Sequence, residues 1–185
     1  MNIFLIFKIN IILQTSRLFL REFTAADAAL VYKLNSDPEV VTYVHEAKLK
    51  TMEDARAVID NIILPQYKNK LGRWAMHIKE TNEFIGWCGL KYLEASGETD
   101  IGYRLKKAVW RFGFATEAVA ETLKYRFDQV HLKEIVGREN IDNTASIHIL
   151  KKIGMRFLKD EKENDELIKI FIATSITDQE TASYT

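Results

Sequence analysis

Cysteine is almost absent from this chain: Cys88 is the only one, so no intramolecular disulfide can form. That scarcity fits a reducing compartment, and we expect a cytoplasmic location. The four histidines have no close cysteine partners, so the spacing of a zinc site is missing and no metal is predicted. Basic and acidic residues number 26 each, giving a net charge of zero. This balance argues against the broad positive field of nucleic-acid-binding proteins.

Proline and glycine are also scarce, with 2 and 8 copies in 185 residues. We find no internal repeat, low-complexity tract or linker, so nothing marks a domain boundary. A hydrophobic content of 47% is enough for a substantial core. The sequence therefore predicts one domain over residues 11–175, followed by a polar, mobile tail at residues 176–185.

The longest apolar run lies at the start of the chain, in residues 1–13. Lys8 interrupts it, it is too short to span a bilayer, and it lacks a basic region and a small-residue cleavage site. We expect no membrane partner and interpret residues 1–10 as an extension before the first strand. A weakly membrane-associating segment is the alternative.

Hydrophobic periodicity then divides the chain into helices and strands. Alternation predicts strands at residues 11–23, 73–79, 84–93, 98–105, 134–139, 155–158 and 167–174, with a charged loop at residues 159–166 between the last two. Helical spacing predicts helices at residues 24–35, from 51 until Pro65 kinks or ends it, at 114–130 and at 144–153. Thr24 with Asp27, and Thr51 with Asp54, are capping-box signals. Helices interspersed with a mixed sheet indicate an α/β or α+β fold.

The most informative stretch is IGYRL at residues 101–105 followed by WRFGFATEA at residues 110–118. A strand ends there, a loop crosses over, and a helix opens beside Gly113 and Ala115. Unpaired amides and the helix dipole at such a start favour a phosphate, and small residues let an oxyanion approach the backbone. An ordinary helix start with a tight loop is the alternative interpretation.

This stretch resembles the pyrophosphate loop of the GNAT superfamily, in particular the WGKGYATEA loop of its RimJ/RimL-like ribosomal-protein N-terminal acetyltransferases. Arg111, Phe112 and Phe114 depart from that pattern. Further blocks resemble the same branch in the same order: RLFLREF at 17–23, SDPEV at 36–40, IGWCG at 85–89, NTAS at 143–146 and KIGM at 152–155. Several weak matches in order are stronger than any one of them.

The resemblance implies a mixed, mostly antiparallel sheet of six to seven strands, flanked by helices, in which the fourth and fifth strands splay apart. It implies an acetyl-CoA-dependent N-acetyltransferase, in which a primary amine attacks the thioester directly in a ternary complex. Acetyl-CoA as co-substrate would lie between the splayed strands. The residues implied in its binding are Tyr103, Leu105, Trp110, Arg111, Phe112, Gly113, Phe114, Ala115, Thr116, Asn143 and Ser146.

The reaction needs a base for the amine and a proton for the leaving thiolate. A carboxylate on the strand facing the cleft suits the first role, and we name Asp100 first and Glu98 second, because residues two apart share a face. Solvent-facing strand charges are the alternative for both. The branch implies Ser146 as proton donor, whereas a first-turn residue bonding backbone is its alternative. The tyrosine that many superfamily members carry is replaced by Leu150.

Two questions stay open from the sequence. The acceptor is either a protein N-terminus or a small-molecule amine, because fold and cofactor loop do not fix it. The fold could also bind acyl-CoA without turnover, as a sensor or structural protein. Association as a homodimer, frequent in this branch, is likewise open, and an unrelated nucleotide-phosphate protein is disfavoured because no G-K-[S/T] motif is present.

Overall fold

The computed structural model describes residues 10–43 and 48–175, and its strands form a single sheet. Its order is β1-β2-β3-β4-β5-β6-β8-β7, and every neighbouring pair is antiparallel except β5 and β6. The strands are β1 (Ile11–Gln14), β2 (Leu18–Glu22), β3 (Gly72–Ile78), β4 (Phe84–Leu93), β5 (Glu98–Leu105), β6 (Glu134–Asn140), β7 (Arg156–Glu163) and β8 (Glu166–Thr174). The mixed, mostly antiparallel sheet is confirmed, with eight strands in place of six to seven.

The additional strand comes from the first segment, which was predicted as one strand over residues 11–23. That prediction is wrong, because the chain reverses at Thr15 and forms the hairpin of β1 and β2. The amide of Thr15 donates to the carbonyl of Leu18 at 2.9 Å, and the Thr15 hydroxyl accepts from the Leu18 amide at 2.9 Å. A polar turn that satisfies its own backbone groups therefore interrupts an otherwise continuous apolar pattern.

The predicted charged loop at residues 159–166 is also wrong. β7 runs through it to Glu163, and only Asn164 and Asp165, both with positive φ, form the turn to β8. β7 lies at the edge of the sheet, where exposed charges are tolerated on both faces. Cross-strand pairing such as Lys169 with Asp160 at 2.9 Å supports the extended conformation.

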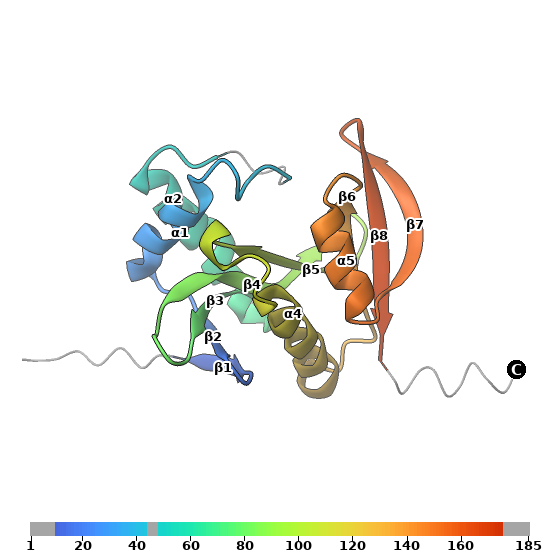
Figure 1. Ribbon diagram of the computed structural model, residues 1–185, viewed down its shortest axis with the longest axis horizontal. Coiled ribbons are helices and arrows are strands. Elements are labelled where there is room, and N and C mark those ends of the chain that lie inside the picture. Colours follow the sequence, from blue (N-terminus) through green and yellow to red (C-terminus); the bar gives the residue numbers. More distant parts are fainter. Residues whose placement is uncertain (1–9, 44–47, 176–185) are drawn as a thin grey trace, which may run out of the picture.

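The helices lie on both faces of the sheet (Figure 1). α4 (Phe114–Tyr125) and α5 (Thr144–Lys152) share one core with residues such as Met76 and Cys88, whereas α1 (Ala28–Asn35) and α2 (Met52–Val58) share another with Ala75 and Trp87. Alternate residues of one strand point to opposite faces, so β3 and β4 contribute to both cores. Burial on both sides explains why these strands have few polar residues.

The helix ends follow the sequence signals. Asp27 and Asp54 each accept from their capping partner, so both capping boxes are confirmed. The second helix stays continuous past Pro65 through a π-helical turn, Ile59–Ile63, and the short α3 (Leu64–Gln66), so Pro65 distorts it and does not end it. None of the helices in the described ranges is long and apolar enough to cross a membrane.

The capping box at Asp27 also contains a buried ion pair. Arg21 donates to both carboxylate oxygens of Asp27 at 2.8 Å, and Thr24 donates its amide to the same group at 2.8 Å. Burial alone would raise the pKa of Asp27, but the hydrogen bonds from Arg21 and Thr24 outweigh burial and lower it. Asp27 therefore stabilises the fold above its unfolded pKa, and this contribution is lost as pH falls through its lower folded pKa.

We predict that Asp27→Asn lowers the free energy of unfolding by about 3 kcal/mol at pH 7, because it leaves Arg21 buried with no charged partner. Urea denaturation measures this loss, which should shrink below pH 4 as the native carboxyl is protonated. Asp160→Asn, in the exposed pair with Lys169, is the control and should cost less than about 1 kcal/mol. Equal losses in the two variants would contradict the prediction.

Candidate functional site

The segment between β5 and α4 presents a row of unpaired backbone amides. β5 ends at Leu105 and α4 begins at Phe114. Arg111 and Gly113 are in the left-handed region, with φ of 67° and 83°, so the chain turns tightly before the helix. In the described part of the chain, no protein group accepts a hydrogen bond from the amides of residues 111–116. Such amides, at the positive end of the helix dipole, form an anion site.

The side chains of this loop face mostly outward. The indole of Trp110 donates to the carbonyl of Leu105 at 2.9 Å, which ties the loop to the end of β5. Phe112 is 63% exposed, and its ring lies 6.3 Å from that of Phe114. Ala115 and Thr116 are half-buried in the first turn of α4, and Arg111 is exposed. The loop thus offers backbone amides and aromatic surface to a ligand.

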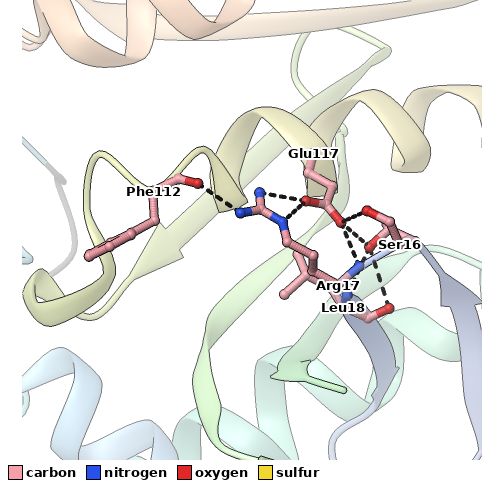
Figure 2. Close-up of polar contacts among 6 residues, drawn as sticks. Ser16, Arg17, Leu18, Phe112 and Glu117 are labelled. Carbon is pink, nitrogen blue, oxygen red and sulfur yellow. Dashed lines mark hydrogen bonds and ion pairs between the residues drawn. The ribbon is translucent and has the colours of Figure 1, made fainter. Parts of the chain in front are cut away.

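A charged contact fixes this loop to the hairpin of β1 and β2 (Figure 2). The carboxylate of Glu117, in the first turn of α4, accepts from the Ser16 hydroxyl at 3.1 Å and from the Arg17 amide at 3.0 Å. The Arg17 guanidinium donates to the same carboxylate at 2.7 Å and to the Phe112 carbonyl at 3.1 Å, and lies 4.4 Å from the centre of the Phe114 ring. We call this contact the Arg17–Glu117 clamp.

The clamp explains how a carboxylate can sit beside an anion site. Burial would raise the pKa of Glu117, but hydrogen bonds from Thr15, Arg17 and Ser16 lower it, so the group is ionised. Its charge alone would repel an incoming phosphate. The guanidinium of Arg17 neutralises that charge and at the same time holds the carbonyl of Phe112, leaving the amides turned outward.

β5 and β6 are in register only at Asp100 and Val136, whereas β4 and β5 pair along the whole of β5. In Figure 1, β6, β8 and β7 point in a different direction from β4 and β5. Two residues after Val136, the amide of Arg138 donates to the carboxylate of Asp100 at 3.2 Å. The side chain of Asp100 therefore ends the ladder, and the splayed strands that the resemblance implied are confirmed as β5 and β6.

A polar network fills the start of this opening on the α5 side. Ser146, only 5% exposed, donates to Glu139 of β6 and is hydrogen-bonded to the hydroxyl of Tyr103 of β5. Asn143 caps α5 by accepting from the amide of Ser146 at 3.3 Å, and its side-chain amide donates to Glu139 at 3.0 Å. The side chains of Tyr103, Ser146 and Asn143 thus gather near the carboxyl group of Glu139.

Two carboxyl groups here have raised pKa values. Burial, followed by the negative charge of Glu139, raises the pKa of Asp100 to about 8, although the Arg138 amide opposes the shift. Burial also raises the pKa of Glu139 to about 7, against hydrogen bonds from Ser146 and Asn143. Burial and the Glu139 charge raise the pKa of Tyr103 as well. Groups that exchange protons near neutral pH are suited to acid–base chemistry.

Glu98 lies in a different environment. It accepts from Arg138 at 3.4 Å, and the same guanidinium holds Glu161 at 3.0 Å and Glu163 at 3.1 Å. Glu98 therefore shares one guanidinium with two other carboxylates at the entrance, while Asp100 lies in the opening. The structure thus separates the two carboxylates that the sequence placed on one face of the strand.

Sequence reasoning missed Glu139. It lies in the run Arg138, Glu139, Asn140, which has the composition of an exposed strand end. Its face could have been derived from alternation, because Ile135 is buried in the core that contains α5 and a side chain at Gly137 would meet Leu150 of α5. Its distance from Ser146 could not have been derived in this way.

Cys88 is buried, and burial raises the pKa of its thiol to about 12, so it is unsuited to act as a nucleophile. Chemistry at the opening therefore has to rely on the carboxyl and hydroxyl groups described above.

The comparison with protein families gives a match over most of the domain. The family described as acetyltransferase (GNAT) domain matches residues 17–156, which include β2, the loop before α4, and α5. The chain is similar to an uncharacterised N-acetyltransferase, p20, of Bacillus licheniformis. Their identity is 33% over 165 residues, covering 86% of this chain and 93% of that protein.

Solved structures share the fold at lower identity. The RimL ribosomal L7/L12 alpha-N-protein acetyltransferase in complex with coenzyme A has a TM-score of 0.78 at 14% identity, with 89% of this chain and 98% of that chain covered. The spermidine N-acetyltransferase of Vibrio cholerae, in complex with CoA and spermine, has a TM-score of 0.74 at 16% identity, with 86% and 96% covered.

The family match spans far more than half of the chain and contains the loop, the clamp and the opening described above. Acetyl-CoA is the acyl donor of this family, and the unpaired amides beside Gly113 fit its diphosphate. This chain therefore belongs to the GNAT acetyltransferase family.

Proposed function

We propose that this chain transfers the acetyl group of acetyl-CoA to a primary amine by direct attack in a ternary complex. The observation that carries the proposal is the opening between β5 and β6, with unpaired amides at one end and the pair Asp100 and Glu139 beside it. An anion site joined to acid–base groups of near-neutral pKa is the combination that acyl transfer from a phosphorylated carrier requires.

Each part of the site has a distinct role in this proposal. The amides of residues 111–116 bind the diphosphate, and the backbone of Tyr103 and Leu105 faces the pantetheine arm along the open edge of β5. Bound acetyl-CoA supplies a thioester carbonyl that an uncharged amine attacks. Asp100 takes the proton released by the attacking nitrogen, because its raised pKa lies close to that of an N-terminal α-amine in solution.

The acceptor enters, in this proposal, beyond the carboxyl end of β6. A cavity of about 460 Å³ lies there. Its lining residues are Thr42, Tyr43, Asn140, Ile141, Asp142, Asp165, Glu166 and Leu167. Three carboxylates in this lining make polyamines a necessary part of any acceptor panel, beside peptides with a free N-terminus. The similar proteins named above include one of each kind by name.

We further propose a cytoplasmic location, supported by the single reduced Cys88 buried against Thr122. A homodimer is the association to test first by light scattering. Neither proposal affects the chemistry at the opening.

The first test of the proposed function measures both cofactor binding and turnover. We predict that acetyl-CoA and CoA raise the melting temperature, whereas ATP does not, because only the former pair reach both the amides and the opening. A thiol-release assay with polyamines and peptides should then detect turnover. Stabilisation by acetyl-CoA without thiol release for any amine would favour the acyl-CoA-binding sensor, and no stabilisation by either CoA species would contradict both functions.

The variant Asp100→Asn tests whether Asp100 is the general base. Asparagine can still accept from the Arg138 amide, so the opening should keep its shape while the proton acceptor is lost. We expect kcat to fall by about 100-fold or more with unchanged acetyl-CoA affinity. Glu98→Gln is the matched comparison on the same strand, and a larger loss of kcat in that variant would transfer the role to Glu98.

We predict that the Arg17–Glu117 clamp affects the affinity for acetyl-CoA and does not affect kcat. Arg17→Ala leaves the charge of Glu117 beside the diphosphate site and releases the Phe112 carbonyl. The pair is partly exposed, so we expect the Kd for acetyl-CoA to rise by about fivefold, with kcat unchanged. Isothermal titration calorimetry measures the change, and Arg56→Ala, in the exposed pair with Glu53, is the control. An unchanged Kd in Arg17→Ala would show that the clamp does not position the loop.

A further inference from the structure

A continuous chain of hydrogen-bonding groups crosses the opening between β5 and β6. It runs from the carboxyl of Glu139 on β6 to the hydroxyl of Ser146 on α5 and then to the hydroxyl of Tyr103 on β5. Tyr103 lies three residues beyond Asp100, the last residue of β5 in register with β6. The chain therefore joins Glu139 on β6 to a part of β5 that is not in register with β6.

The protonation state of Glu139 sets the direction of this chain, because each hydroxyl has one proton to donate. When Glu139 is ionised, Ser146 donates to it and Tyr103 donates to Ser146, so the Tyr103 proton points inward. When Glu139 is protonated, it donates to Ser146, and Ser146 donates to the Tyr103 oxygen. The proton of Tyr103 is then free to point into the opening.

We propose that Glu139 supplies a proton through Ser146 to Tyr103, and that the Tyr103 hydroxyl donates its own proton to the sulfur that leaves during acetyl transfer. This inference rests on the proposed function and assigns its acid. Tyr103 is the catalytic residue that touches the reacting atoms, whereas Ser146 and Glu139 act through it.

The protons balance in this scheme. The new N–C bond forms as the C–S bond breaks, and the electron pair of that bond goes to sulfur. Asp100 receives the proton of the attacking nitrogen and returns it to solvent. Tyr103 protonates the sulfur and is reprotonated by Ser146, which is reprotonated by Glu139, and Glu139 regains a proton from water. The net products are the amide and the free thiol, with no proton gained or lost by the protein.

The groups around Glu139 favour reversible protonation of its carboxyl group over a permanently ionised carboxylate. From β5 it faces Asp100 and Tyr103, and from α5 it faces Ser146 and Asn143. The neighbouring cation, Arg138, is directed to Glu98, Glu161 and Glu163, and no hydrogen bond or ion pair joins it to Glu139 in the described residues. Burial raises the pKa of Glu139 to about 7, so the protonated form is available at neutral pH.

The test compares Tyr103→Phe, Glu139→Gln and wild type over pH 5 to 10. In wild type, kcat/KM should be lost at low pH as Asp100 is protonated and at high pH as Glu139 ionises, so the coupled pair gives a bell-shaped profile near pH 7 to 8. Tyr103→Phe should lower kcat by about 100-fold with an unchanged Kd for acetyl-CoA. Glu139→Gln should lose the falling limb, and its rising limb should move to lower pH, because the charge that raises the pKa of Asp100 is gone.

A second measurement needs neither substrate nor turnover. Ser146→Ala removes a hydrogen bond that lowers the pKa of Glu139, so carboxyl ¹³C NMR of the free protein should show that pKa rising further. Glu53→Gln, at an exposed carboxylate on α2, is the matched control for both experiments.

The outcomes separate the two proposals. No turnover by wild type overturns the proposed function and the relay with it. Turnover by wild type together with an unchanged kcat and pH profile in Tyr103→Phe and Glu139→Gln overturns the relay alone. The relay is also overturned if Tyr103→Phe and Glu139→Gln raise the Kd for acetyl-CoA and leave kcat unchanged, or if the pKa of Glu139 is unchanged in Ser146→Ala. Either result would mean that these residues serve only in binding or packing.

Discussion

The separation of β5 from β6 after a single registered pair is the constraint on which the site depends. β5 and β6 pair at Asp100 and Val136. The carboxylate of Asp100 then accepts a hydrogen bond from the Arg138 amide, which would otherwise extend the β5–β6 ladder. Beyond that point the edge of β5 is open, and Tyr103 reaches across to Ser146 on α5. Asp100 therefore ends the strand pairing and also lies near the carboxyl group of Glu139. The opening and its acid–base groups thus depend on the same residue.

Charged groups are arranged differently at the start of α4 and at the opening between β5 and β6. At the start of α4, Arg17 neutralises Glu117, which leaves the amides around Gly113 attractive to an anion. At the entrance, the guanidinium of Arg138 forms ion pairs with Glu98, Glu161 and Glu163. Deeper in the opening, no described cation is paired with Glu139, and its burial raises its pKa. Burial thus raises the pKa values of Asp100 and Glu139, whereas hydrogen bonds from Thr15, Arg17 and Ser16 lower the pKa of Glu117.

The elements that the sequence predicted well are those whose pattern is set by burial on one or two faces. β4 and β5 match their predicted ranges, 84–93 and 98–105, because turn-forming residues bound both strands. The two misassignments occur where alternation carries no information. The turn at Thr15 lies between two apolar segments that read as one, and β7 is an edge strand whose charges resemble those of a loop.

The sequence by itself determined the turn at Gly113 and the helix caps, because a glycine with positive φ, an unpaired helix start and a capping box all depend on residues within one turn of each other. Only the tertiary structure decided which side chains meet there. Arg17 and Glu117 are separated by 100 residues along the chain, and Tyr103 and Ser146 by 43. The raised pKa of Glu139 likewise depends on what is packed around it, since desolvation and neighbouring charge are properties of the folded surroundings and not of the local sequence.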